Sequence, residues 1–101
     1  MSNHKCSIAI QILPMGDGEI SVGIVTKIIE YIQACGLTYE VGPFETTIEG
    51  ELEELMEIVK TCQTLAIKEG ASNVMSYVKI FYNPGGVLTI EEKTKKFRTT
   101  P

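Results

Sequence analysis

The segment Gly42–Glu51, GPFETTIEGE, lies between two apolar stretches and leads into an acidic amphipathic helix. Gly42-Pro43 is expected to break the preceding strand, because proline lacks a backbone N–H and fixes φ. The short link predicts a hairpin between strands at Leu37–Val41 and Phe44–Ile48, after which Glu49-Gly50 turns the chain into the helix. Polar side chains of this segment would thus lie near a strand end, where rigid backbone can direct them at a ligand.

On either side of this segment, apolar residues alternate at strand spacing or recur at helical spacing. The other predicted elements are a strand over Lys5–Leu13, helices over Ser21–Cys35 and Glu51–Glu69, a strand over Asn73–Tyr82 and a short helix over Thr89–Phe97. Pro14–Glu19 has the composition of a loop. Thr89 and Glu92 form the signature of a capping box at the start of the last helix.

This order, β-α-β-β-α-β plus a terminal helix, predicts an α+β fold, a ferredoxin-like sandwich. Right-handed crossovers would place both main helices on one face of a four-stranded antiparallel sheet. With 101 residues, the chain is expected to form a single domain over residues 1–101.

The face of the sheet opposite the helices is predicted to be apolar. Met75, Tyr77 and Phe81 would point there, beside Ala9 and Gln11 on the adjacent strand. Because this apolar area exceeds what a monomer usually exposes to water, we expect another subunit to cover it.

Composition excludes several classes of partner. The net charge is −4 and Arg98 is the only arginine, which argues against nucleic-acid binding through phosphates. No apolar run approaches the roughly 20 residues that span a bilayer, so we expect a soluble, cytoplasmic protein. Cys6, Cys35 and Cys62 are odd in number and widely spaced, which favours reduced core residues over a disulfide framework or a zinc site.

Three polar side chains are candidates for ligand contact. Glu49 either favours the start of the second helix or accepts hydrogen bonds from a cationic or amino-bearing ligand, with Thr46 alongside. Gln11, in mid-strand, is either an interface hydrogen-bonding group or a ligand contact. Thr46 and Thr47 are also ordinary strand formers, and Thr47 has no further role.

Other residues have both a structural and a functional interpretation. Tyr39, Phe44 and Tyr77 are either core or interface residues or platforms for ring stacking, and Lys79 is a solvated or interface charge. The loop Gly16–Glu19 lacks the lysine of a phosphate loop and has too few acidic ligands for calcium.

The sequence offers no convincing catalytic pair. His4 is the only histidine and lies near the terminus, which argues against histidine acid–base catalysis. We expect a binding protein, not an enzyme, with no metal site and no catalytic residue.

These features together resemble the small thiamine-binding protein family. The resemblance is carried by Gln11 with Pro14 and Gly16, by Gly42-Pro43 followed by Thr46-x-Ile48-Glu49-Gly50-Glu51, and by Val78-Lys79-Ile80 and Thr89-Ile90-Glu91-Glu92-Lys93. It covers almost the whole chain, and the segment from Gly-Pro to Glu-Gly is its most specific part.

The resemblance implies a ferredoxin-like fold, dimers and tetramers formed through the sheets, and binding of thiamine or its hydroxymethylpyrimidine part. Catalysis is not established for the family. Its polar signature falls on Gln11, Thr46 and Glu49. This chain departs from the family at Glu45, where a small residue is usual, and the added carboxylate bears on ligand preference.

An acidic protein suits such a ligand, because thiamine combines a cationic thiazolium with an aminopyrimidine that has donor and acceptor edges. We expect Glu49 and Gln11 to hold the pyrimidine edge while Phe44 or a tyrosine covers a ring. No cofactor other than this ligand is predicted.

Four alternatives use the same fold. An acylphosphatase-like hydrolase needs an arginine after the first strand, and Pro14–Glu19 has none. An RNA-binding module needs an aromatic strand with basic partners, and a metal chaperone needs paired cysteines after the first strand; both features are missing. An oligomeric regulatory or scaffold protein without a small-molecule ligand remains open.

Overall fold

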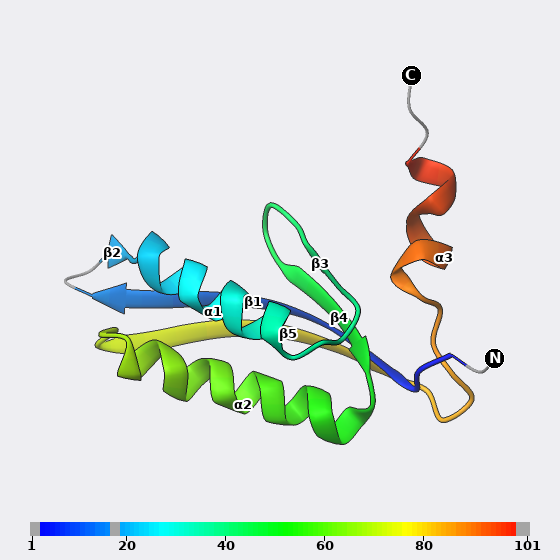
Figure 1. Ribbon diagram of the computed structural model, residues 1–101, viewed down its shortest axis with the longest axis horizontal. Helices are drawn as coiled ribbons and strands as arrows, with labels where there is room; N and C mark the ends of the chain where they lie inside the picture. The colour runs from blue at the N-terminus through cyan, green and yellow to red at the C-terminus, as the bar shows by residue number, and fades with distance from the viewer. Residues whose placement is uncertain (1–2, 17–18, 99–101) are drawn as a thin grey trace.

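The computed structural model describes residues 3–16 and 19–98. The elements are β1 (Cys6–Gly16), β2 (Glu19–Ile20), α1 (Val22–Ala34), β3 (Tyr39–Val41), β4 (Thr46–Gly50), α2 (Leu52–Lys68), β5 (Asn73–Tyr82), α3 (Ile90–Thr94) and a 3₁₀ turn (Lys95–Phe97). Both main helices lie on one side of the sheet, and α3 projects from its end (Figure 1).

The sheet is antiparallel, with β1 next to β5 on one side and next to β4 on the other, and with β3 outside β4. The order β5-β1-β4-β3 confirms the predicted ferredoxin-like sandwich. The short β2 is an addition, because it pairs only with Met15 and Gly16 at the far end of β1. The predicted hairpin is confirmed as the pairing of β3 with β4.

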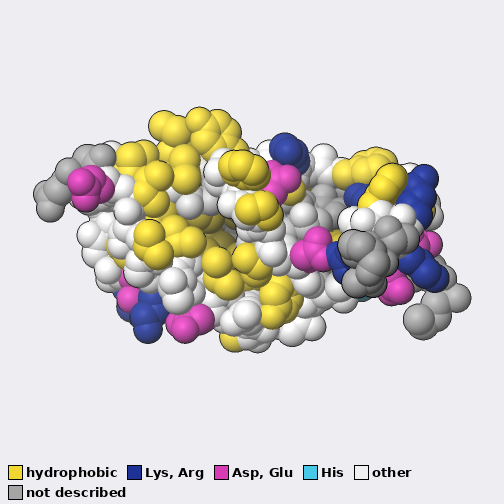
Figure 2. Space-filling model, turned by 90° about the horizontal axis from the view of Figure 1, so that it is seen from above, with side chains coloured by type: hydrophobic (Ala, Val, Ile, Leu, Met, Phe, Trp, Pro, Cys, Tyr) yellow, Lys and Arg dark blue, Asp and Glu magenta, His cyan; other side chains and the backbone are white. Residues whose placement is uncertain are grey.

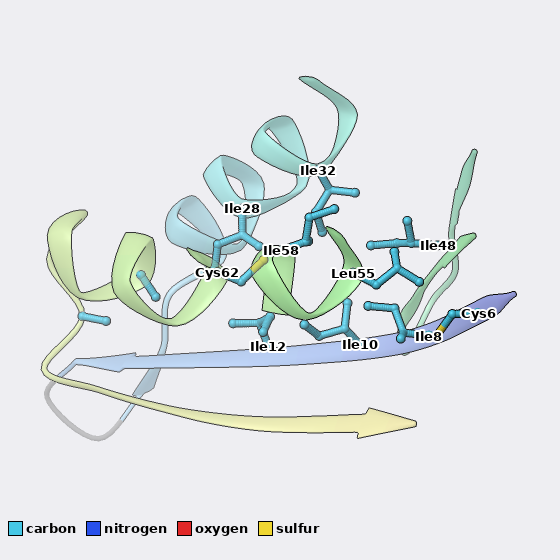
Figure 3. Packing of buried hydrophobic residues seen from close by; sticks show 12 residues of the cluster. Cys6, Ile8, Ile10, Ile12, Ile28, Ile32, Ile48, Leu55, Ile58 and Cys62 are labelled. Carbon is cyan, nitrogen blue, oxygen red and sulfur yellow. The ribbon is translucent and has the colours of Figure 1, made fainter. Parts of the chain in front are cut away.

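The core lies between the helix layer and the inner face of β1. Even-numbered residues of β1 point toward α1 and α2, as a strand's alternation requires (Figure 3). The buried cluster is Cys6, Ile8, Ile10, Ile12, Ile28, Ile32, Ile48, Leu55, Ile58, Cys62, Ala66 and Ala71. Each fully buried aliphatic side chain stabilises the fold by about 1.5–3 kcal/mol.

Two sequence-based boundaries are wrong. Pro14–Gly16 is part of β1 and not a loop. Proline is tolerated there because its nitrogen, which carries no N–H, faces away from β5, the strand that pairs with β1 at this position. Glu49 and Gly50 still belong to β4, so the chain enters α2 at Glu51, whose carboxylate forms a capping box with Glu54. Residues 17 and 18 of the predicted loop lie outside the described residues.

The C-terminal segment crosses one end of the open face of the sheet. The predicted capping box of Thr89 and Glu92 is confirmed, and Lys93 lies 5.8 Å from the centre of the Phe81 ring. Farther along this face Met75 and Tyr77 remain 48% and 57% exposed. The radius of gyration is 14.5 Å, against about 13 Å for a compact domain of this length, which fits a projecting α3.

Candidate functional site

A pocket opens where β1 lacks a neighbouring strand on one edge. The ladder with β4 ends at Ile10↔Thr46, and the ladder with β2 begins only at Met15↔Ile20. The intervening stretch of β1, residues 11–14, pairs with β5 alone. Between this edge, α1 and the turn of residues 42–45 lies a pocket of about 210 Å³. Figure 2 looks onto this edge of the molecule and shows hydrophobic side chains around a hollow.

The pocket wall is mainly apolar. From the helix side α1 contributes Val25, Ile28, Ile29 and Ile32, and β1 contributes Ile10, Ile12 and Leu13. Three of the four predicted ligand-binding residues, Gln11, Phe44 and Thr46, also line it. An apolar wall with a few convergent polar groups is typical of small-molecule sites.

Thr46 and Gln11 supply polar groups that are free to meet a ligand. The Thr46 residue is only 6% exposed, yet its hydroxyl bonds to no residue within 3–16 and 19–98, and no buried side-chain polar atom described there lacks a partner. Because Thr46 also lines the pocket, its hydroxyl is a polar group that a ligand there can meet. Gln11 is half-buried on the other face of β1 at the same gap, and its amide also lacks a partner among these residues.

Phe44 stands at the rim. It belongs to the turn that joins β3 and β4, which is closed by a 2.9 Å hydrogen bond from the Gly42 N–H to the Glu45 carbonyl. Because the turn points the ring away from the core, Phe44 is 79% exposed. An aromatic ring so placed can cover a flat ligand held in the pocket.

Among the described residues that line this pocket, which exclude residues 17 and 18, Glu45 has the only ionisable side chain. Its carboxylate lies 3.3 Å from the Lys79 ammonium, which reaches it across β1. Both groups are partly solvated, so the ion pair contributes at most about 1 kcal/mol. A cationic ligand can therefore compete with Lys79 for Glu45 at low cost.

Glu49, the fourth predicted residue, lies elsewhere. It faces the open side of the sheet next to Ser7, and its buried carboxylate accepts a hydrogen bond from the Ile90 N–H at the start of α3. The alternative in which Glu49 favours the start of the second helix is wrong, because it serves α3 instead. Glu49 lies three positions along β4 from Thr46, a distance of roughly 10 Å, and the two side chains point to opposite faces of the sheet.

The remaining candidates lie outside this pocket. Tyr39 packs against the core, Tyr77 and Lys79 lie on the open face, and Thr47 lines the other side of the β3–β4 turn. His4 contacts Glu51 at 3.3 Å, far along β1 from the gap. Cys6 and Cys62 are buried, as predicted, whereas Cys35 is only partly buried against the core. Burial raises the pKa of the Cys62 thiol to about 12.

The described residues also bear on two other kinds of site. In the ranges 3–16 and 19–98, no cluster of three His, Cys, Asp or Glu side chains is arranged to hold a metal ion. No helix in this part of the chain has both the length and the apolar character to cross a membrane.

Comparison with known proteins identifies the family. The sequence profile of the thiamine-binding proteins matches residues 8–98. The chain belongs to the thiamine-binding protein family. A relative in Clostridium perfringens, a UPF0045 protein, is 48% identical over 93 residues, which cover 92% of this chain and 97% of the relative.

Solved structures of family members share the fold. A domain of unknown function (DUF77) from Bacillus cereus superposes with a TM-score of 0.85 and is 38% identical, with 97% of this chain and 93% of that chain covered. A Thermotoga maritima protein, provisionally named for thiamine biosynthesis or salvage, superposes with a TM-score of 0.79 and is 37% identical, with 92% of this chain and 98% of the Thermotoga chain covered.

The sequence pattern gives no sign that α1 and the backbone form much of the pocket wall. The apolar stripe on α1 lines the pocket as well as the core, and Glu45, whose carboxylate is expected to bear on ligand preference, also lines the pocket. An interruption in pairing along β1 depends on where β2 and β4 dock, so local sequence patterns carry no signal for it.

Proposed function

We propose that this protein binds thiamine through its hydroxymethylpyrimidine part, in the pocket beside Gln11, Phe44 and Thr46, without catalysing a reaction. One observation carries the proposal: the first half of the segment that carries the family resemblance, residues 42–46, folds into the wall and rim of an apolar pocket with a few polar groups, which suits a small heterocycle.

The size of the pocket favours one ring over the whole vitamin. Its volume of about 210 Å³ lies below the roughly 300–1,000 Å³ typical of sites that enclose drug-sized ligands. The pyrimidine ring would enter with Thr46 as a hydrogen-bonding partner, while Gln11, on the other face of β1, would meet the ligand at the gap in the sheet. The cationic thiazolium would stay at the rim, near the Glu45 carboxylate and the Phe44 ring.

A binding role fits the chemistry of the wall. Within residues 3–16 and 19–98, the side chains that line the pocket include one carboxylate, already paired with Lys79, and no histidine, cysteine or lysine. General acid–base or nucleophilic catalysis requires a positioned group of such a kind. We therefore propose storage, buffering or delivery of the ligand in the cytoplasm.

We also propose that copies of the chain associate through the open face of the sheet as dimers or tetramers. Met75, Tyr77 and Phe81 are each about half exposed on this face of the protomer. The same exposed face supports the alternative function, a regulatory or scaffold oligomer without a small-molecule ligand. Light scattering at micromolar concentration measures the association directly, and a clean monomer would contradict it.

Calorimetric titration with thiamine, its phosphates, hydroxymethylpyrimidine and the thiazole fragment tests the function. We expect saturable binding of thiamine and of the pyrimidine fragment. Thr46→Val should weaken both about 2–10-fold, since a neutral hydrogen bond contributes about 0.5–1.5 kcal/mol. Thr47→Val, the same change on the opposite face of β4, is the matched control and should have no effect. Absence of binding by every compound would support the scaffold alternative.

A further inference from the structure

One residue in the pocket wall has backbone groups that no strand uses. In an antiparallel sheet, the N–H and C=O of one residue point to the same edge, and successive residues alternate between edges. The Lys5 carbonyl accepts from the Asn83 N–H at 2.8 Å, so odd-numbered residues of β1 face β5. The Pro14 carbonyl accepts from the Ser21 N–H at 2.9 Å, so even-numbered residues face the opposite edge.

Among the even-numbered residues, Ile12 falls in the gap. Ile10 is paired with Thr46, and Pro14 has no N–H and bonds to Ser21 through its carbonyl. Continued pairing with β4 would bring Phe44 opposite Ile12, but the turn of residues 42–45 leaves the sheet there. Within the described ranges neither the N–H nor the C=O of Ile12 has a backbone or side-chain partner.

These two groups lie in an apolar environment. Ile12 is only 9% exposed, and most of the residues that line the pocket with it, Ile10, Ile28 and Ile29 among them, are aliphatic and offer no hydrogen-bonding side chain. Buried backbone groups without partners are rare because each costs free energy. A ligand that both accepts and donates would therefore gain from reaching this edge, as peptides do when they bind along an open strand.

We propose that the backbone of Ile12 reads the aminopyrimidine edge of the ligand. Its N–H would donate to a ring nitrogen, and its C=O would accept from the amino group on the neighbouring carbon. This inference rests on the proposed function and adds the basis of its selectivity. Because the atoms belong to the backbone, the selectivity depends on the gap in the ladder and not on the side chain at position 12.

The 4′-oxo analogue of thiamine, oxythiamine, tests this pattern. It keeps the size and the charge of thiamine but presents an N–H and a carbonyl where thiamine presents a ring nitrogen and an amino group. The Ile12 N–H would then face another donor, and the Ile12 C=O would face another acceptor. We expect oxythiamine to bind at least tenfold more weakly than thiamine in calorimetric titrations.

Amide hydrogen exchange, followed by NMR, provides a second readout on the unmodified protein. Without ligand, the Ile12 amide should exchange faster than those of Gln11 and Leu13, which face β5. Thiamine should slow exchange at Ile12 at least tenfold and leave its two neighbours unchanged.

If thiamine binds while Ile12 exchange is unchanged and oxythiamine binds equally well, the role of Ile12 is refuted and the proposed function stands. If thiamine and the pyrimidine fragment do not bind at all, the proposed function fails, and this inference fails with it.

Discussion

Replacing Glu49 by glutamine separates two roles for the most buried carboxylate among the residues that the structure describes. Glu49 is 4% exposed, and its carboxylate accepts a hydrogen bond from the Ile90 N–H. Glutamine keeps the shape and one acceptor oxygen but removes the charge. Since hydrogen bonds to charged groups contribute about 1.5–3 kcal/mol and neutral ones about 0.5–1.5 kcal/mol, Glu49→Gln should destabilise the docking of α3 by about 1–2 kcal/mol.

The assay measures stability and affinity in the same variant. Hydrogen exchange at the Ile90 amide should accelerate by the factor that corresponds to 1–2 kcal/mol, about 5–30-fold. Thiamine affinity should change by less than about twofold, because Glu49 does not line the pocket. Glu53→Gln, an exposed change of the same charge on α2, serves as the control and should alter neither quantity.

The opposite pattern would refute this account of Glu49. Loss of a direct charged contact with the ligand would lower affinity by about 1–3 kcal/mol. A tenfold or greater loss of affinity with unchanged exchange at Ile90 would place Glu49 in the binding site, as the family resemblance implied.

Three further predictions concern stability and reactivity. Gly50→Ala should destabilise the fold by about 1–3 kcal/mol in denaturant titrations, because a Cβ there would lie 2.7 Å from a Glu54 carboxylate oxygen and 3.3 Å from both Leu37 and Leu55. The same change at Gly23, where a Cβ would meet only the Ser21 hydroxyl at 3.9 Å, should be neutral or stabilising, and equal effects would contradict this. Native Cys62 should resist alkylation at pH 8, since burial raises its pKa to about 12; labelling as fast as in the unfolded chain would be the contrary result. The pKa of Glu92 is lowered, chiefly by the hydrogen bond from the Thr89 N–H, so its contribution to α3 is complete above the unfolded pKa and is lost as pH falls through the folded one. NMR shifts of α3 should therefore change in acid at the lowered pKa of Glu92, and Glu92→Gln should remove that transition.

Local patterns predicted the elements that local chemistry determines. The capping box of Thr89 and Glu92 and the limits of β5 follow from neighbouring residues, and both are confirmed. The course of β1 through Pro14 was missed because composition marks proline as a strand breaker, whereas only a paired edge excludes it. The cap at Glu51 was missed since glutamate is an uncommon N-cap.

The candidate site was predictable in part for the same reason. Gln11, Phe44 and Thr46 come together because the β1–β4 register follows from the fold, and the fold could be read from periodicity. The bond between Glu49 and Ile90 joins residues 41 positions apart, and the open edge at Ile12 arises because the ladders of β2 and β4 with β1 do not meet. Both depend on how the elements dock in the tertiary structure, which residue spacing along the chain does not predict.

The most direct measurement is a crystal structure of the protein grown with thiamine. We predict that the pyrimidine ring lies between α1 and the β3–β4 turn, in contact with Thr46 and with the backbone of Ile12, and that the thiazolium lies toward Glu45. Thiamine bound on the open face beside Glu49, with this pocket empty, would contradict the account.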